Sequence, residues 1–509
     1  MINNLGRELP DKINRKKIIP FQKIDKKYMQ RKSILHKDSF SSKIIPSIKE
    51  VIKQVGLRDG MTISFHHHLR NGDYVVNKVM AAIASLGYRD INVAASGIFP
   101  VHAPLLRYIE DGVITGFEVN YMIGPIAKAV SSGILKKPVV FRTHGGRPRA
   151  IEEGDLIIDV AFIAASSADC YGNANGVYGP SRFGPIGYAV PDELFAKKVV
   201  IITDNLVTYP CTPTSISQKY VDYVVEVDKI GESQGIIFGT TKITKDPIRL
   251  KTAEDATRVI KASGLLKNDF SFQTGAGGTS LAVANYIYEI LKKNKIVGSF
   301  GGGGITEFFI KMLKEGYFKK LLDLQSLDLI AVESLGTNLN HIEVDASFYA
   351  NPHNKGCWVD QLDIMILGAM EIDKDFNVNV ITGSNGVIMG GSGGHSDTAA
   401  GSRLAIVIAP LVRKNYPTIV EKVTTITTPG DTIDVLVTEG GIAVNPKRRD
   451  IIKLLEEDNI QLKSIKNLKE KCDAILGKKY MNLKTEKKIV GVVEYRDGTI
   501  IDVIRKVKE

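Results

Sequence analysis

The sequence contains little cysteine, and none of it is paired. Its 509 residues include four cysteines, which lie far apart at Cys170, Cys211, Cys357 and Cys472. No Cys-x-x-Cys pair and no zinc-type spacing occurs, which argues against a disulfide framework and indicates a reducing compartment. Neither Cys170 nor Cys211 has a histidine partner by motif, so we interpret both as buried, inert thiols.

Long apolar runs are absent as well. No stretch of 18 apolar residues occurs, and the basic N-terminus lacks the apolar core of a signal peptide. We therefore expect a cytoplasmic protein with no membrane partner. The composition, with 44% hydrophobic and 24% charged residues, is that of an ordinary globular protein, and the length suggests two domains.

Signatures of nucleotide and nucleic-acid binding are also missing. None of the glycine clusters spells GxGxxG, and no GxxxxGK[ST] loop occurs. The formal net charge is +11, and the basic excess is greatest in residues 7–32 and 447–488. No compact aromatic-plus-basic motif accompanies that charge, so we predict no nucleic-acid partner. Anionic small molecules or an acidic protein partner fit the charge equally well.

Glycine, in contrast, is plentiful and falls into clusters. Residues 271–307 predict a short strand (270–272), a glycine loop (274–279), a helix (280–292), a second strand (295–300) and then four consecutive glycines. A further cluster, MGGSGGHSD at 389–397, follows a strand-like segment. Successive backbone N–H groups in such loops can hold an oxyanion. Tight strand connections would explain one cluster, but the three together favour a binding site.

The two halves of the chain repeat one pattern. Ser64 to Ile98 match Ser271 to Ile305 at one constant offset, with the same order of strand, loop and helix. At a slightly smaller offset Asp159 meets Asp363, and Asp169, Asn173 and Asn175 meet Asp373, Asn377 and Asn379. Such a match predicts a duplicated domain. We predict a basic arm at 1–40, an N-terminal domain at 41–240 and a C-terminal domain at 241–509, which ends in a β-hairpin around Asp497 and Gly498.

Near-continuous apolar runs recur along both halves. They lie at 139–141, 156–165, 199–203, 329–332, 362–369 and 423–428. Strands that are buried on both faces have this composition, and helices between them imply parallel sheets. We therefore predict an α/β fold with mainly parallel sheets.

Histidines and arginines are concentrated in two segments. In His66-His67-His68, extended neighbours point to opposite faces, so the three cannot reach one ion without a turn; we expect no metal, and an anion- or thioester-facing role for one or two of them. FRTHGGRPRA (141–150) directly follows a strand. A solvated basic turn is one interpretation of that segment. Carboxylate binding is the other, because arginine suits carboxylates and α/β folds bind ligands beyond the C-terminal ends of strands.

With these segments collected, the whole chain resembles the citrate lyase alpha subunit family of the CoA-transferase superfamily. The motifs that carry the resemblance are SFHHHLRNGDYVVN, FRTHGGRPRAIEEGD, FQTGAGGTSLAVA, GSFGGGGITEFF and VIMGGSGGHSDTAAGSR. The resemblance implies two tandem CoA-transferase-like domains and a transfer of the acyl-carrier or CoA thioester from acetyl to citrate. It implies as partners citrate, acetyl-CoA or an acetyl-acyl-carrier protein, the citrate lyase beta and gamma subunits, and further copies of this chain. No tightly bound cofactor is expected, since the phosphopantetheine of the carrier, or free acetyl-CoA, supplies the thiol.

One departure bears on the mechanism. More distant CoA-transferases carry a nucleophilic glutamate shortly before a segment like ITEFFIKMLKEG, and superposition places about Gly303 at that position. The resemblance therefore implies a route without an enzyme thioester, in which a citrate carboxylate attacks the acetyl thioester and forms a mixed anhydride. Two alternatives stay open. One is a covalent transferase or thioesterase that uses Glu307, Glu333 or Glu439, and the other is a non-catalytic protein that docks CoA-like groups.

On this interpretation we assign three groups of residues. The oxyanion and thioester region comprises Gly301, Gly302, Gly303, Gly304, Gly393 and Gly394. The phosphopantetheine group is assigned to Gly275, Gly277, Gly278, Gly390 and Gly391. The substrate carboxylates are assigned to His67, Arg70, Arg142, His144, Arg147 and Asn385.

Overall fold

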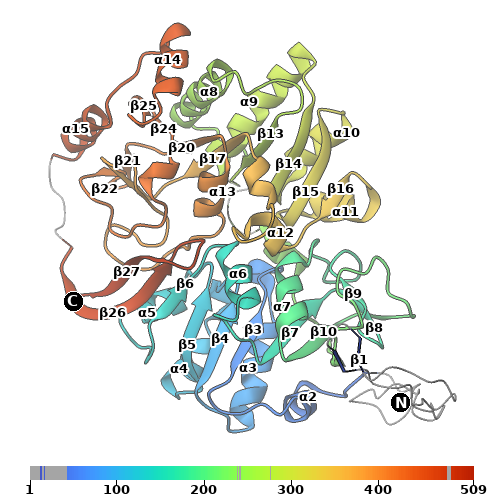
Figure 1. The fold of residues 1–509 in the computed structure, drawn as a ribbon. Helices are drawn as coiled ribbons and strands as arrows, with labels where there is room; N and C mark the ends of the chain where they lie inside the picture. The colour runs from blue at the N-terminus through green and yellow to red at the C-terminus, as the bar shows by residue number, and fades with distance from the viewer. Residues whose placement is uncertain are drawn as a thin grey trace.

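Two large sheets, one for each half of the chain, dominate the fold (Figure 1). The computed structural model describes residues 43–237, 239, 242–275, 277–477 and 483–508, together with the short antiparallel strands β1 (Lys12–Ile13) and β2 (Lys16–Lys17). Apart from these two strands, the predicted basic arm lies outside the described residues. No helix among the described residues is both long enough and apolar enough to cross a bilayer.

The first sheet has nine strands. In spatial order they are β12 (Tyr223–Glu226), β10 (Lys198–Thr203), β7 (Val160–Ala165), β3 (Thr62–Phe65), β4 (Ile91–Ala95), β5 (Ile114–Val119), β6 (Val139–Phe141), β26 (Thr485–Glu494) and β27 (Ile500–Val507). All neighbours are parallel except β26 and β27. The helices of this half are α2 (Ile48–Gln54), α3 (Val75–Ser85), α4 (Leu105–Glu110), α5 (Pro125–Ser131), α6 (Gly146–Glu152) and α7 (Val190–Phe195).

The second sheet has eight strands. Their spatial order is β16 (His341–Glu343), β15 (Phe318–Ser326), β14 (Gly298–Ile305), β13 (Ser271–Thr274), β17 (Ile364–Gly368), β20 (Leu404–Ile408), β24 (Val435–Thr438) and β25 (Gly441–Val444), of which only β24 and β25 pair antiparallel. Its helices are α8 (Pro247–Ala262), α9 (Gly278–Asn294), α10 (Glu307–Lys314), α11 (Leu329–Thr337), α12 (Ala346–Ala350), α13 (His395–Gly401), α14 (Arg449–Glu457) and α15 (Ile465–Leu476).

Three small sheets flank the large ones. β11 (Leu206–Val207) pairs with β8 (Ser167–Asp169), which pairs with β9 (Ala174–Asn175). β19 (Val378–Asn379), β18 (Glu371–Asp373) and β23 (Ile419–Val420) repeat this arrangement in the second half, and β21 (Val412–Arg413) pairs with β22 (Tyr416–Pro417).

The predicted duplication is confirmed by the strand order. The order β12-β10-β7-β3-β4-β5-β6 of the first sheet corresponds strand for strand to β24-β20-β17-β13-β14-β15-β16 of the second. The matched polar residues repeat a local structure too. The Asp169 carboxylate accepts from the Asn173 side chain at 2.7 Å, and the Asp373 carboxylate accepts from Asn377 at 3.2 Å. The mainly parallel, duplicated α/β fold is therefore as predicted.

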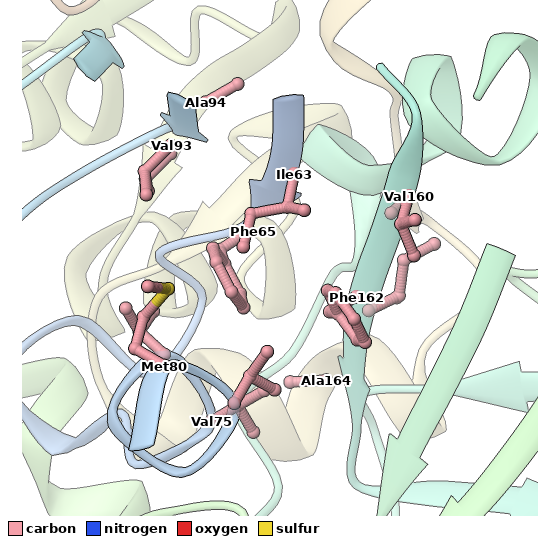
Figure 2. Packing of buried hydrophobic residues seen from close by; sticks show 14 of the residues in the cluster. Ile63, Phe65, Val75, Met80, Val93, Ala94, Val160, Phe162 and Ala164 are labelled. Atoms are coloured by element: carbon pink, nitrogen blue, oxygen red, sulfur yellow. The ribbon is translucent and has the colours of Figure 1, made fainter. Parts of the chain in front are cut away.

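The core of the first half lies on β3 and β7, at the centre of the sheet. Ile63 pairs in register with Val160, and the rings of Phe65 and Phe162 stack with centroids 5.8 Å apart. Figure 2 shows these side chains packed with Val75 and Met80 of α3. Because both faces of these strands are buried, their sequences are continuous apolar runs rather than alternating ones.

The C-terminal hairpin is formed, but it belongs to the first sheet. β26 and β27 pair antiparallel around the turn at Asp497 and Gly498, and β26 adds in parallel to β6 (Figure 1). The chain thus returns to its N-terminal half after completing the second sheet. The hairpin was assigned to the C-terminal domain by sequence order, which carries no information on this long-range pairing.

Two predicted strands were wrong. Residues 329–332 begin helix α11, because the Asp328 side chain accepts from the backbone N–H of Ala331 and caps that helix. Residues 423–428 form no strand, and their backbone is held instead by carboxylates: Thr424 N–H donates to Glu371 and Ile426 N–H to Asp502, each at 2.7 Å. The apolar residues fit a buried environment in both cases, but local capping and carboxylate partners determined the backbone.

Candidate functional site

The candidate site is a cavity of about 660 Å³ between the two halves. From the second half it is lined by the carboxyl ends of β13, β14, β15 and β17 and by the glycine turn 390–394. The first half contributes Arg70, Tyr121, His144 and Tyr188. Arg70, Tyr121 and His144 follow the carboxyl ends of β3, β5 and β6, so the binding edges of both sheets face one space.

Gly275 and Gly277 face this cavity from the end of β13. A Cβ on either glycine would have only the Ser280 hydroxyl nearby, at 3.8 Å, so protein packing does not require glycine there. Gly277 is the N-cap of α9, and no side chain caps that helix end. The positive end of a 17-residue helix therefore points toward the cavity. Gly278 differs, because it does not line the cavity and a Cβ there would lie 2.9 Å from the Lys242 carbonyl oxygen.

The four consecutive glycines lie inside strand β14 rather than in a loop after it. A Cβ at Gly301 would lie 2.6 Å from the Phe309 ring, and one at Gly302 would lie 2.6 Å from the Trp358 ring. Close packing of aromatic side chains on both faces of the strand explains these two glycines, and neither lines the cavity. Gly303 and Gly304 do line it, at a register shift where Gly303 has a φ of +92°.

The turn 390–394 joins the two halves. The Met122 N–H donates to the Gly390 carbonyl at 3.0 Å, and the His144 N–H donates to the Gly393 carbonyl at 2.8 Å. A Cβ at Gly391 would lie 2.0 Å from the Asn120 carbonyl oxygen, so glycine is required for this close approach. All the glycines of this turn, including Gly390, Gly391, Gly393 and Gly394, line the cavity.

Asp397 of α13 fixes the turn from behind. Its carboxylate accepts from the Thr143 hydroxyl at 2.8 Å and from the Gly145 N–H at 3.0 Å, both in the first half. Burial raises the pKa of Asp397 to about 6. The His395 ring, which lines the cavity, is held by the Thr428 hydroxyl at 2.7 Å and the Gly368 carbonyl at 2.8 Å, and burial lowers its pKa to about 4. His395 is therefore neutral, with its Nε2–H donated to the Gly368 carbonyl.

The histidine triplet divides into two groups. His67 lies behind the cavity, where its Nε2 is 3.1 Å from Gln325 Oε1 and its ring contacts that of Tyr188 at a tilt of 44°, with centroids 4.6 Å apart. His66 and His68 lie next to each other and apart from His67. Their rings are 5.5 Å apart, and His66 Nε2 is 3.5 Å from Asp192. Burial lowers the pKa of all three imidazoles well below 6.5. Among the described residues, no three His, Cys, Asp or Glu side chains form a cluster that could hold a metal ion.

Arg142 and Arg147 lie outside the cavity and bind carboxylates of the protein. Arg147 makes a bidentate pair with Asp192 at 2.6 and 2.7 Å, and the Asp192 side chain is fully buried. Arg142 pairs with Glu118 and, at 2.9 Å, with Glu494 of the C-terminal hairpin. Both guanidinium groups thus connect segments of the fold, and the substrate role assigned to them has no support in this geometry.

The arginines that do line the cavity are Arg70 and Arg413. Arg70 donates to the Ile236 carbonyl at 2.9 Å and lies 5.8 Å from the centre of the Phe99 ring. Arg413 donates to the Ala369 carbonyl at 2.6 Å, and sequence reasoning missed it because it lies in a short hairpin without a motif. Asn385 does not line the cavity; it is exposed, and its side chain accepts from the Val387 N–H at 3.2 Å.

His144 and two tyrosines complete the inner wall. Burial, with Arg147 nearby, lowers the pKa of His144 to about 3, so its ring is neutral. The Tyr188 ring is 4.8 Å from that of His144, and burial raises the pKa of Tyr188 well above 10. The Tyr349 hydroxyl accepts from the Gln273 side chain at 3.2 Å. Sequence reasoning also missed these tyrosines and Gln325, since no short motif surrounds them.

The cavity wall contains no acid among the described residues. It includes no aspartate, glutamate, lysine or cysteine. The three glutamates considered as nucleophiles, Glu307, Glu333 and Glu439, are all outside it, and Glu439 accepts from the Leu411 N–H at 3.0 Å. The wall therefore combines arginine, neutral imidazole, phenol and backbone amide, which suits anionic ligands.

Comparisons with known proteins agree on one family. A family model described as citrate lyase, alpha subunit, matches residues 41–507. Citrate lyase alpha chains from Haemophilus influenzae and Klebsiella pneumoniae are each 46% identical to this chain, covering 92% of it and 93% and 92% of their own lengths.

Two solved structures are also similar to this chain. A crystal structure described as a citrate lyase alpha subunit from Streptococcus mutans in complex with citrate is 48% identical, with a TM-score of 0.91 over 93% of this chain and 92% of that one. A malonate decarboxylase alpha subunit from Acinetobacter baumannii shares the fold, with a TM-score of 0.62 at 17% identity over 86% of this chain and 89% of that one. Taken with the cavity and the duplicated sheets, these matches show that the chain belongs to the citrate lyase alpha subunit family.

Proposed function

We propose that this chain transfers the thioester of an acetyl-acyl-carrier protein, or of acetyl-CoA, from acetyl to citrate. The single observation that carries the proposal is the cavity wall, which among the described residues offers arginine and backbone amides to anions but no glutamate, aspartate or cysteine that could form an enzyme thioester or anhydride. Citrate brings its own carboxylate nucleophile to such a site. The chain would work within a citrate lyase complex that also contains beta and gamma subunits.

The proposed reaction has two steps. A carboxylate oxygen of citrate attacks the acetyl carbonyl carbon, the carbon–sulfur bond breaks, and a mixed anhydride and a thiolate form. The thiolate then attacks the citryl carbonyl carbon of the anhydride and releases acetate. No proton is gained or lost overall, so the protein needs to position the reactants, stabilise two oxyanions and exclude water.

The residues of the cavity suit these tasks. Arg70 and Arg413 are our revised candidates for the citrate carboxylates, in place of Arg142 and Arg147. The backbone amides of Gly303 and Gly394 are the candidates for the oxyanions, whereas the Gly393 N–H already donates to the Asn120 carbonyl at 3.2 Å. The phosphopantetheine is assigned to the Gly275–Gly277 end, where the N-terminus of α9 favours negative charge.

Tyr188 is a further candidate oxyanion donor. Its ring is held by His67 and His144, with centroids 4.6 and 4.8 Å away. Its raised pKa keeps the phenol protonated, so it can donate a hydrogen bond without losing its proton.

One test distinguishes the proposed route through a mixed anhydride from a route through a covalent enzyme thioester. The enzyme is incubated with acetyl-CoA and borohydride, with and without citrate, and citryl-CoA is measured by mass spectrometry. We expect citryl-CoA to form with citrate, and borohydride without citrate to leave activity intact, because no enzyme thioester exists to be reduced. Inactivation by borohydride, with a reduced glutamate found by peptide mapping, would overturn the proposal, as would the absence of citryl product.

Arginine variants test the carboxylate assignment. Arg413→Gln should raise the citrate KM about tenfold to a hundredfold, the range expected for losing one charge-assisted hydrogen bond, with the acetyl-CoA KM little changed. Arg403→Gln is the matched control, since Arg403 is equally an exposed arginine of the second half but pairs with Asp363 at 3.0 Å, away from the cavity. An unchanged citrate KM in the Arg413 variant would contradict the assignment.

A further inference from the structure

The cavity opens to solvent beside the N-terminus of α9 and the β21–β22 hairpin. Four of the residues that line it are exposed, namely Gly277, Gly368, Met389 and Arg413. Met389 leaves 49% of its surface exposed, although it is a large apolar side chain. These residues mark the mouth through which a thioester must enter.

Five cations surround one side of this mouth, and we refer to them as the basic rim. They are Lys242, Lys245, Arg249, Arg413 and Lys414, all exposed. The Lys242 backbone touches Gly278, next to the exposed Gly277. Burial lowers the pKa of Arg413, and the positive charge of Arg249 on α8, which is close by, lowers it further. Lys414 follows Arg413 in the turn of the hairpin, with a φ of +56°.

Most of this charge is not neutralised by neighbouring acids. Arg249 lies 3.6 Å from Asp246, and Glu439 near the hairpin is occupied by the Leu411 N–H. Within the described part of the chain, no carboxylate lies within ion-pair distance of Lys242, Lys245 or Lys414. The rim therefore presents a net positive field around the cavity mouth.

Exposed apolar side chains lie among these cations. Ile248, which precedes Arg249, is 58% exposed, and Tyr416, the strand partner of Arg413, is 38% exposed. A small anion gains nothing from such side chains, whereas an apolar centre with a charged rim is typical of a surface that binds another protein. The combination favours a protein over the phosphates of a free nucleotide.

We propose that the basic rim, with Ile248, Tyr416 and Met389, is the docking surface for an acidic protein that carries the thioester on its phosphopantetheine arm. This inference rests on the proposed transfer reaction, and it locates the partner. The positive rim attracts the acidic partner, and the arm enters past Gly277 toward the glycine turns. The field accelerates association and makes it sensitive to salt, while the chemistry stays inside the cavity.

The test uses a triple charge reversal, Lys242→Glu, Lys245→Glu and Lys414→Glu, in the full chain. None of these lysines lines the cavity. The matched control is Lys261→Glu, Lys267→Glu and Lys293→Glu, which changes the net charge equally at exposed positions near the C-terminal ends of α8 and α9. Three donors are compared: the acetylated acyl carrier protein of the same complex, acetyl-CoA, and S-acetyl-pantetheine, which is uncharged.

We expect the rim variant to lose tenfold or more of its kcat/KM with the carrier protein and to lose most of the salt dependence of that reaction. Its kcat/KM with S-acetyl-pantetheine should stay within about twofold of wild type, and the control variant should behave as wild type. Carrier kinetics equal to those of the control would overturn the inference. So would a loss confined to acetyl-CoA, which would assign the rim to nucleotide phosphates, or an equal loss with all three donors.

A binding measurement distinguishes this inference from the proposed reaction. If wild-type enzyme makes no citryl product from any donor, the proposed function fails. Binding of the carrier protein to wild-type and rim-variant chains, measured by calorimetry at two salt concentrations, still tests the docking surface by itself.

Discussion

A matched pair of glycine substitutions distinguishes packing glycines from glycines that face a ligand. In Gly301→Ala the new methyl group would lie 2.6 Å from the Phe309 ring and 3.1 Å from the Leu321 side chain. Phe309 cannot swing away, because it is buried and packs on Phe272 and Phe318, with ring centroids 5.9 and 6.0 Å away. Forcing a methyl group into such a core costs about 1–3 kcal/mol, which for a domain of about 250 residues lowers Tm by about 2–12 °C.

Gly275→Ala should have the opposite profile. Its methyl group would meet only the Ser280 hydroxyl, at 3.8 Å, and the backbone is not in the left-handed region. We therefore expect Tm within about 2 °C of wild type, while kcat/KM for the thioester falls tenfold or more because the methyl group occupies cavity space.

Calorimetry gives Tm, and citryl-CoA formation well below Tm gives activity. Gly301→Ala should keep kcat/KM within about threefold. The reasoning fails if Gly301→Ala is as stable as wild type but inactive, or if Gly275→Ala is unstable and fully active once folded.

Three further predictions concern the inner wall and its supports. Arg147→Ala should cost about 3–5 kcal/mol of stability, measured by denaturant unfolding, because it removes the guanidinium that pairs with the fully buried Asp192 carboxylate; a normal stability with a raised citrate KM would restore the substrate role. Because the folded pKa of His144 is about 3, below its ordinary value, its contribution to stability is present above about pH 6.5 and is lost as pH falls toward 3. His144→Asn should therefore flatten the dependence of unfolding free energy on pH between 6.5 and 4, and an unchanged slope would refute the lowered pKa. Tyr188→Phe should lower kcat about a hundredfold with little change in the citrate KM, as expected for an oxyanion donor; a change in KM alone would assign the hydroxyl to ground-state binding.

Elements whose signal is local could be predicted from the sequence. Strands β6, β7, β10 and β17 are apolar runs between loops, and the predicted spans overlap the observed ones. The duplication could be predicted from the sequence because both halves keep the same order of strands, loops and helices at a nearly constant offset. Helix α11 was mistaken for a strand because its first turn, LIAV, is as apolar as a strand, and the deciding contact is the single Asp328 cap.

The site was predicted only in part, because the partners of buried charges are distant in sequence. Nothing near Arg142 in sequence indicates that its guanidinium meets Glu494, 352 residues away. Arg147 is likewise occupied by Asp192, 45 residues away. The glycine clusters can be recognised in the sequence, but their roles cannot. Gly301 is required by close packing and Gly303 lines the cavity, and only the residues around each glycine in the folded structure distinguish these two roles.

The absence of acid from the described cavity wall has an electrostatic reason as well as a chemical one. Two unit charges 4 Å apart interact by about 4 kcal/mol at an effective dielectric of 20, so one carboxylate in the wall would oppose a bound tricarboxylate by an energy of that order. A covalent route requires such a carboxylate at the reacting carbon and accepts that repulsion. At position 303 the φ of +92° and the Gln273 side chain, which would lie 2.3 Å from a Cβ, leave no room for a glutamate. The absence of a carboxylate from the described wall therefore has two effects. It removes an enzyme nucleophile, and it favours binding of the citrate carboxylate that we propose acts as the nucleophile instead.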